Sequence, residues 1–222
     1  MQFVYHSHAG DETLHVDVKA YEHLFKVRRI GIGTTLFWRN ASDDILYEYV
    51  LESIGKKEAL LRLTHQTYAP VFSARSLHVG WSIVDPKIVE KTLPMLNELG
   101  VEKMTFFYAE FSQKQFKLDR ERMERIVINS SQQCGRSRLM WFEMLPNLKA
   151  FLSAYPEATI IDFSERKLTA HDDVRTLVVG PEGGFSDKER AMFDAHRILG
   201  LSCSSILRSE TAVTAAVSKI LA

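Results

Sequence analysis

The stretch TLVVGPEGGFSDKE, residues 176–189, decides the fold. Its apolar part, Leu177–Val179, is a continuous run of the kind found in strands buried on both faces of a parallel sheet. Three glycines within five positions follow, and residues 186–189 then have the Ser-x-x-Glu capping box that begins a helix. This order of strand, glycine loop and helix indicates an α/β sheet, in which ligands bind at the carboxyl ends of the strands.

The glycine loop has two interpretations. Glycine removes the side chain where a ligand or another backbone segment must approach closely, but a tight structural turn has the same composition. The loop lacks both the Gly-Lys-Ser/Thr ending of a phosphate-binding loop and the Gly-x-Gly-x-x-Gly spacing of a dinucleotide fingerprint. The residues alone therefore allow two interpretations: a site for a ligand other than these, or a turn with no ligand.

Outward from this loop, strands alternate with helices back to about residue 71. A helix is predicted to begin at Asp85-Pro86 and to end before Gly100, because the acid caps the helix and Pro suits its first position. A second helix starts at Asp119. Further strands are predicted at 76–84, 104–108 and 159–163.

Residues 1–70 have a different sequence pattern: short runs rich in β-branched and aromatic residues, at 34–38, 45–51 and 59–64, are separated by polar turns. Several closely spaced strands favour a small antiparallel barrel. We therefore predict a β-barrel domain over 1–70 and, over 71–222, a larger α/β domain with a mainly parallel sheet.

Two further segments carry candidate functional groups. In SILRSETA, residues 205–212, Arg208 and Glu210 flank a strand-to-helix junction, where they could be an ion pair or helix cap as readily as catalytic groups. In QQCGRSR, residues 132–138, Arg136 and Arg138 could bind phosphate or base edges, because guanidinium groups offer forked donors.

Composition limits the function. The chain has 28 Lys plus Arg against 28 Asp plus Glu, so a strongly cationic, indiscriminate nucleic-acid binder is excluded. The exception is 103–138, with 8 basic against 4 acidic residues. Cys134 and Cys203 have no metal-ligand or disulfide spacing, and no apolar run is long enough to span a membrane. We expect a cytoplasmic protein with no metal and no membrane partner.

In their order along the chain, these segments resemble the RsmE family, the 16S ribosomal RNA uridine N3-methyltransferases of the SPOUT superfamily. The most specific parts are VGPEGGFS at 179–186 and ILRSETA at 206–212, and 97–101, 133–138 and 23–29 support them. The resemblance implies a PUA-like RNA-binding barrel before a SPOUT α/β domain whose C-terminal chain forms a trefoil knot. It also implies a homodimer that acts on 16S rRNA within the 30S subunit.

The resemblance implies S-adenosylmethionine as cofactor, held largely by main-chain groups at the two junctions. Uridine N3 must lose a proton before it can accept a methyl group, and charged residues lie beside the glycine loops. We therefore expect Glu182 or Glu210 to assist deprotonation, and Arg208, or Arg136 from the second subunit, to stabilise the resulting anion. The RNA contacts expected are Arg28, Arg29, Gln133, Arg136 and Arg138. The cofactor residues expected are Leu177, Val179, Gly180, Pro181, Gly183, Gly184, Ser205, Ile206, Leu207, Thr211 and Ala212.

The sequence departs from the family pattern at three places. Gln132-Gln133 stands where Glu-Gln is usual, with Met140 in place of a common Pro. Residues 202–205 read Ser-Cys-Ser-Ser where Leu-Gly-Pro-Arg is frequent, and Arg28 replaces an apolar residue. The missing glycine at Cys203 leaves a non-catalytic RNA-binding or ribosome-assembly factor as an alternative. A SPOUT methyltransferase acting on transfer RNA is the other.

Overall fold

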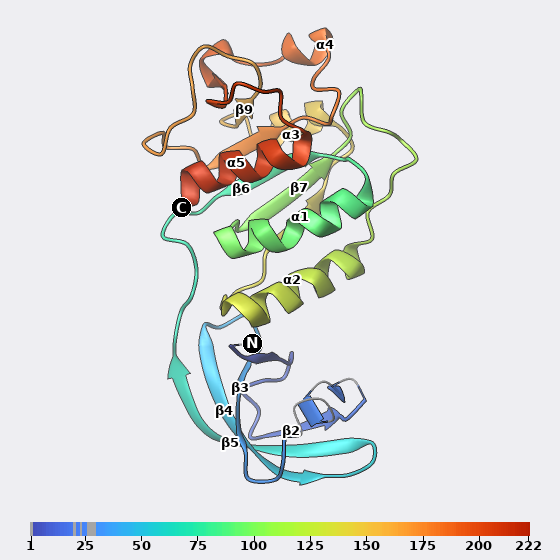
Figure 1. Cartoon of the computed structure of the whole chain (residues 1–222), viewed down its shortest axis with the longest axis vertical. Coiled ribbons are helices and arrows are strands. Elements are labelled where there is room, and N and C mark those ends of the chain that lie inside the picture. The colour runs from blue at the N-terminus through green and yellow to red at the C-terminus, as the bar shows by residue number, and fades with distance from the viewer. Residues whose placement is uncertain (1, 20, 23, 26–29) are drawn as a thin grey trace. The chain divides into compact units, whose positions relative to one another are not determined.

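The structure is a computed structural model that describes residues 2–19, 21–22, 24–25 and 30–222. The chain forms two compact units, one of residues 1–72 and 131–139 and the other of residues 73–130 and 140–222. The sequence indicated a boundary near residue 70, but nothing in it indicated that 131–139 would join the first unit. Figure 1 labels the elements along the chain.

The first unit contains a curled five-stranded sheet. Its order is β1-β3-β4-β5-β2, with β1 parallel to β3 and the other pairs antiparallel. The β4–β5 ladder shifts register after Glu48 and after Leu51, and such bulges bend and twist a sheet. The strands are β1 (Val4–Tyr5), β2 (Thr13–Asp17), β3 (Thr35–Arg39), β4 (Ile45–Ile54) and β5 (Glu58–Tyr68).

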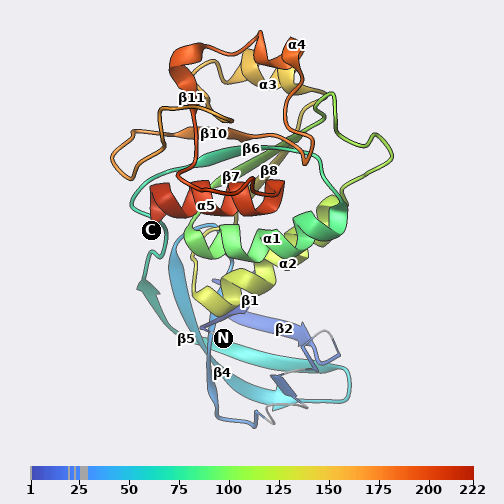
Figure 2. The same cartoon turned by 45° about the horizontal axis from the view of Figure 1, so that its top comes forward.

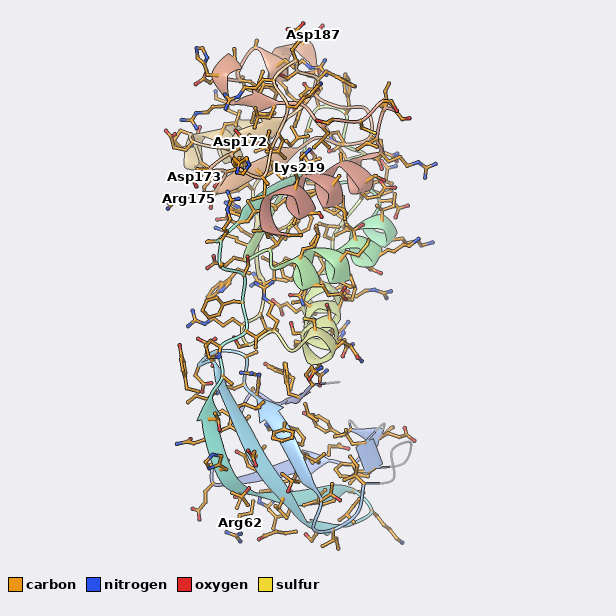
Figure 3. The ribbon with its side chains drawn as sticks, turned by 60° about the vertical axis from the view of Figure 1, so that its left-hand side comes forward. Arg62, Asp172, Asp173, Arg175, Asp187 and Lys219 are labelled. Atoms are coloured by element: carbon orange, nitrogen blue, oxygen red, sulfur yellow. The ribbon has the colours of Figure 1, made fainter. Side chains whose placement is uncertain are left out.

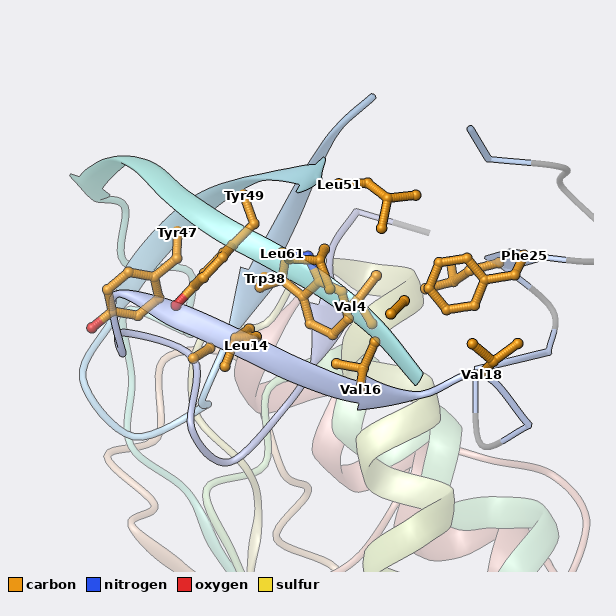
Figure 4. Packing of buried hydrophobic residues seen from close by; sticks show 13 residues of the cluster. Val4, Leu14, Val16, Val18, Phe25, Trp38, Tyr47, Tyr49, Leu51 and Leu61 are labelled. Atoms are coloured by element: carbon orange, nitrogen blue, oxygen red, sulfur yellow. The ribbon is translucent and has the colours of Figure 1, made fainter. Parts of the chain in front are cut away.

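The concave side of this sheet holds its own hydrophobic core (Figure 4). Trp38, Tyr49 and Leu61 are fully buried there. They come from three neighbouring strands, so the alternating side chains of each strand meet at one centre. On the solvent side, Arg62 of β5, labelled in Figure 3, forms an ion pair with Glu52 of β4. Where the sequence predicted a small barrel, the structure shows this curled five-stranded sheet.

Residues 131–139 extend the first unit through specific hydrogen bonds. Gln2 N donates to Gln132 O at 2.7 Å, and Tyr5 N donates to Gln132 Oε1 at 2.9 Å. Ser137 Oγ donates to the buried carboxylate of Asp44 at 2.6 Å. A nine-residue segment is thus tied to the sheet by polar contacts rather than by a strand.

The second unit is built on a six-stranded sheet in the order β11-β9-β10-β6-β7-β8, in which all neighbouring pairs are parallel. The predicted parallel sheet is confirmed. Its strands are β6 (His78–Ser82), β7 (Lys103–Phe107), β8 (Trp141–Met144), β9 (Thr159–Ile161), β10 (Thr176–Val179) and β11 (Ile198–Leu199).

Helices cover both faces of this sheet. Figure 2 shows α1 and α5 side by side along one face. On the other face α3 comes so close to β6 that a Cβ at Gly80 would lie 2.4 Å from the Phe151 ring. The helices are α1 (Pro86–Leu99), α2 (Arg120–Cys134), α3 (Leu148–Ala154), α4 (Asp187–Arg190) and α5 (Ser209–Leu221), with a 3-10 turn at Ala195–Arg197.

Local signals in the sequence determine several of these helix ends. Asp85 caps α1 by accepting from Lys87 N at 2.8 Å, and Gly100 ends the helix with φ 101°. Ser186 and Glu189 form the predicted capping box of α4, although that helix has only one turn. In the described part of the chain, no helix is long and apolar enough to cross a membrane.

Candidate active site

The glycine loop follows β10 directly, as the sequence predicted. It turns at Pro181, whose carbonyl accepts from Gly184 N at 2.9 Å. Gly184 has φ 70°, a conformation that side chains with a Cβ adopt only with strain. The loop therefore contains a real tight turn, and its glycines also have the second role described next.

The loop forms one wall of a cavity of about 350 Å³ at the carboxyl ends of β9 and β10. A second wall comes from residues 200–212, which lead into α5. The two junctions that the sequence singled out are thus brought together. Of the residues expected at a cofactor, those lining the cavity are Val179, Gly180, Pro181, Gly183, Gly184, Ser205, Ile206, Leu207 and Ala212.

Two residues expected at the cofactor lie outside this lining. Leu177 is fully buried within β10, and Thr211 is exposed on the first turn of α5. Cys203, where the family pattern has glycine, is exposed and lines the cavity, so its side chain does not close it.

A chain of buried hydrogen bonds joins the two walls. Ser209 Oγ donates to the carbonyl oxygen of Gly180 at 2.5 Å and accepts from Trp81 Nε1 at 2.8 Å. Beside it, Ser82 Oγ donates to the carbonyl oxygen of Val179 at 3.0 Å. The start of α5 is therefore bonded to the loop by Ser209, and side chains from β6 hold both partners.

Glu210 follows Ser209 and carries an unusual oxygen. Its Oε2 is buried and has no hydrogen-bond partner in the structure, the one side-chain oxygen of which this is true among the described residues. An unpaired buried acceptor costs free energy, so it marks a place where a donor is missing. Glu210 is thus a carboxylate with spare accepting capacity between two residues that line the cavity, Ser209 and Ala212.

The charged neighbours of Glu210 do not satisfy it. Arg208 is the N-cap residue of α5, makes no capping hydrogen bond with its side chain and is exposed. Among the described residues Arg208 forms no salt bridge, so Arg208 and Glu210 do not form an ion pair with each other. Glu182 is exposed at the tip of the glycine loop and lines the cavity.

Sequence reasoning missed the third wall, which follows β9. Asp162 accepts from Arg190 Nε at 2.7 Å, and this hydrogen bond raises the pKa of Arg190. Phe163 and Lys167 line the cavity beside them. The available signal was the apolar run at 159–161 ending in an acid, because polar groups at the carboxyl ends of neighbouring parallel strands converge.

The predicted RNA-contact motif lies in the first unit. Arg138 is exposed, forms a two-pronged contact with Asp44 and stacks 5.6 Å above the Phe72 ring. Burial raises the pKa of Asp44, but hydrogen bonds from Arg138 and Ser137 outweigh it and hold the pKa below its ordinary value.

The other members of that set differ in exposure. Gln133 is exposed, whereas Arg136 is buried and its Nε donates to the Arg138 carbonyl at 2.9 Å. Sequence reasoning did not predict this burial, and a contact from Arg136 to RNA or uridine stays a prediction. Arg28 and Arg29 lie outside the described residues.

Comparison with known proteins decides the family. The profile of the RNA methyltransferase domain family matches residues 73–221. The ribosomal RNA small subunit methyltransferase E of Helicobacter pylori strain J99 is 42% identical over 216 residues, which is 96% of each chain. This chain belongs to the ribosomal RNA small subunit methyltransferase E family. The resemblance seen in the sequence is therefore confirmed.

Solved structures agree with the observed fold of this methyltransferase. A protein of Legionella pneumophila described as a methyltransferase, solved with its bound cofactor S-adenosylmethionine, has a TM-score of 0.82 at 26% identity and covers 98% of this chain and 96% of its own. A ribosomal RNA small subunit methyltransferase E from Neisseria gonorrhoeae has a TM-score of 0.79 at 22% identity, with coverage of 98% and 96%. The second likeness supports the fold alone.

Proposed function

We propose that this methyltransferase transfers a methyl group from S-adenosylmethionine to N3 of one uridine in the 16S RNA of the small ribosomal subunit. The observation that carries the proposal is the cavity at the carboxyl ends of β9 and β10 with the unpaired Glu210 oxygen next to its wall. The relatives' names supply the RNA, and the Legionella structure supplies the cofactor.

The residues present fit this cofactor. The cavity wall is largely main chain and small or apolar side chains, which suits an adenine ring and a ribose better than a phosphate. Two glycines of the wall have no room for a side chain against the protein behind them: a Cβ at Gly200 would lie 2.6 Å from the Ser164 carbonyl, and one at Gly183 would lie 3.2 Å from Phe111 Cβ. Asp162 and the peptide groups of 180–184 offer the acceptors and donors that a nucleoside needs.

S-adenosylmethionine, when bound, supplies a methyl carbon attached to a positively charged sulfur. What the protein must add is a uridine whose N3 has lost its proton. Glu210, whose Oε2 has no hydrogen-bond partner, would accept that proton, and Arg208, exposed one residue before the helix, would stabilise the resulting anion. Glu182 at the loop tip is the second carboxylate available.

Assembly and topology extend the proposal. A homodimer would bring Arg136 of one subunit toward the reaction of the other, as the family resemblance implies. We also propose that the chain from 198 onward is threaded as a trefoil knot. The packing of α5 on β10 and α1, with Ser209 bonded to Gly180, supports this because the C-terminal segment is held against an earlier loop.

RNA docking is assigned to the first unit as a PUA-like barrel and to the basic segment 103–138. Gln133 and Arg138, which are exposed, would contact the RNA, and Arg28 and Arg29 are further predicted contacts. The substrate is 16S rRNA in the 30S subunit, so the enzyme would act in the cytoplasm. The open cavity at Cys203 argues against the non-catalytic alternative, and the relatives' names favour ribosomal over transfer RNA.

The chemical roles are tested by single-turnover methylation of 30S subunits. Glu210→Gln keeps the shape of the side chain and removes its basicity, so we expect a rate at least about 100-fold lower, within the range typical of a lost general base. Arg208→Ala should slow the reaction as well, whereas Glu98→Gln on α1 should not. Wild-type rates in both Glu210→Gln and Arg208→Ala would overturn these roles.

A further inference from the structure

The loop that follows β7 carries an exposed aromatic residue at the edge of the sheet where the cavity lies. β7 and β10 are parallel and separated only by β6, so their following loops leave the sheet at the same edge. Phe111 in this loop is 53% exposed. It does not line the cavity but lies against Gly183, which does.

The loop is held firmly in place. Glu110 N donates to Glu189 Oε1 at 2.9 Å, and Ser186 Oγ donates to Glu110 Oε2 at 2.6 Å. Ser186 and Glu189 are also the capping box of α4, so the loop and the start of that helix share one polar network. A further bond from Ala109 N to Ser112 Oγ at 3.2 Å closes the turn around Phe111.

Contact with the glycine loop fixes the base of the Phe111 side chain. A Cβ at Gly183 would approach Phe111 Cβ to 3.2 Å, so the absence of a side chain there leaves room for the aromatic residue. Phe111 therefore lies against the glycine loop while about half of the residue's surface stays in solvent. Such a preformed flat surface binds at little cost in conformational entropy.

Two other exposed apolar residues at the site are placed differently. Phe163 and Ile206 line the cavity itself, so a bound cofactor would contact them. Phe111 contacts Gly183 from outside that lining and remains available to a second reactant. A pyrimidine taken out of its stack has a flat π face to cover, and aromatic side chains are the usual platform.

We propose that Phe111 is the platform on which the target uridine stacks during methyl transfer. The proposal rests on the proposed function and adds to it the residue that holds the base. Because Phe111 lies outside the cavity, loss of the ring should lower the rate of RNA methylation and leave the affinity for S-adenosylmethionine unchanged.

The kinetic test uses the full-length protein and 30S subunits from a strain that lacks its own enzyme. Phe111→Ala should lower kcat/KM for the subunit about 5- to 100-fold, the range expected from losing one base-stacking contact. Phe111→Trp should retain most of the rate, and Phe111→Leu should fall between them. Met95→Ala, an exposed apolar residue on α1, is the matched control and should behave as wild type.

Binding and crosslinking separate the possible failures. Calorimetric titration with S-adenosylmethionine should give wild-type affinity for Phe111→Ala and a weaker one for Phe163→Ala. RNA carrying 5-iodouridine at the target position should, on irradiation, crosslink to the peptide that contains Phe111. If wild type makes no N3-methyluridine, the proposed function is wrong; if it does and Phe111→Ala matches its rate, or the crosslink maps elsewhere, the platform is wrong.

Discussion

Ser209 Oγ lies 2.5 Å from the carbonyl oxygen of Gly180, across 29 positions of sequence. Ser209 Oγ also accepts from Trp81 Nε1, so this hydroxyl makes both of its hydrogen bonds to buried groups. One buried serine therefore sets the distance between the glycine loop and the first turn of α5. The predicted base, Glu210, is the next residue, so the position of its carboxylate depends on this contact.

Removal of that hydroxyl should weaken both the fold and the cofactor site. Ser209→Ala leaves the Trp81 donor and the Gly180 acceptor buried without a partner, which costs about 1–3 kcal/mol. We expect a lower free energy of unfolding in urea and a clearly higher Kd for S-adenosylmethionine. Ser218→Ala, later on the same helix, should change neither, and equal effects of the two variants would contradict the bridging role.

The turn at Gly184 should not tolerate a side chain. With φ 70°, Gly184→Ala introduces a left-handed residue at a cost of about 1–2 kcal/mol and shifts the loop that lines the cavity. Cofactor affinity measured by calorimetry should fall. The control is Gly31→Ala, where an added Cβ meets nothing within 4 Å; a similar loss there would show that the effect is not specific to the loop.

Acid should destabilise the protein through His78. Burial, aided by the charge of Lys103, lowers the pKa of His78 to about 4 from 6.5. The unfolded chain therefore binds a proton that the folded chain does not, between about pH 6.5 and pH 4. Stability should fall by about 2–3 kcal/mol as pH decreases through that window.

The His78 effect is measured by urea unfolding at about pH 7, 6 and 5, which cover the upper part of that window. His78→Gln should flatten the dependence on pH, whereas exposed His65→Gln should leave it as in wild type. Glu143, whose pKa is lowered to about 2 by hydrogen bonds from Thr105, Tyr155 and Lys103 that outweigh its burial, adds a further loss only below about pH 4.5. An unchanged slope in His78→Gln would refute the assignment.

The attachment of 131–139 to the first unit should depend on Asp44. Asp44→Ala removes the acceptor that Ser137 and Arg138 share. Because Arg138 is exposed, we expect the loss of these hydrogen bonds to cost about 1–3 kcal/mol. Thermal unfolding should shift to lower temperature and RNA affinity should decrease. Exposed Asp173→Ala is the control, and equal melting temperatures for the two variants would contradict the structural role of Asp44.

Local signals explain which parts of the fold were predictable. Helix α1 followed from Asp85-Pro86 and Gly100, because caps act over a few residues. The Asp44–Ser137 contact joins positions 93 apart, and no local pattern encodes such a pair. The glycine loop was recognisable from its composition, whereas the cavity wall at Asp162 and the position of Phe111 depend on which strands become neighbours in the sheet.

The central claim is the reaction itself, and one measurement tests it most directly. The purified protein is incubated with S-adenosylmethionine carrying a labelled methyl group and with 30S subunits from a strain that lacks its own enzyme, and the 16S RNA is then digested to nucleosides for mass spectrometry. The account predicts labelled N3-methyluridine at about one per subunit. Label in another nucleoside, or none at all from a protein that binds the cofactor, would contradict it.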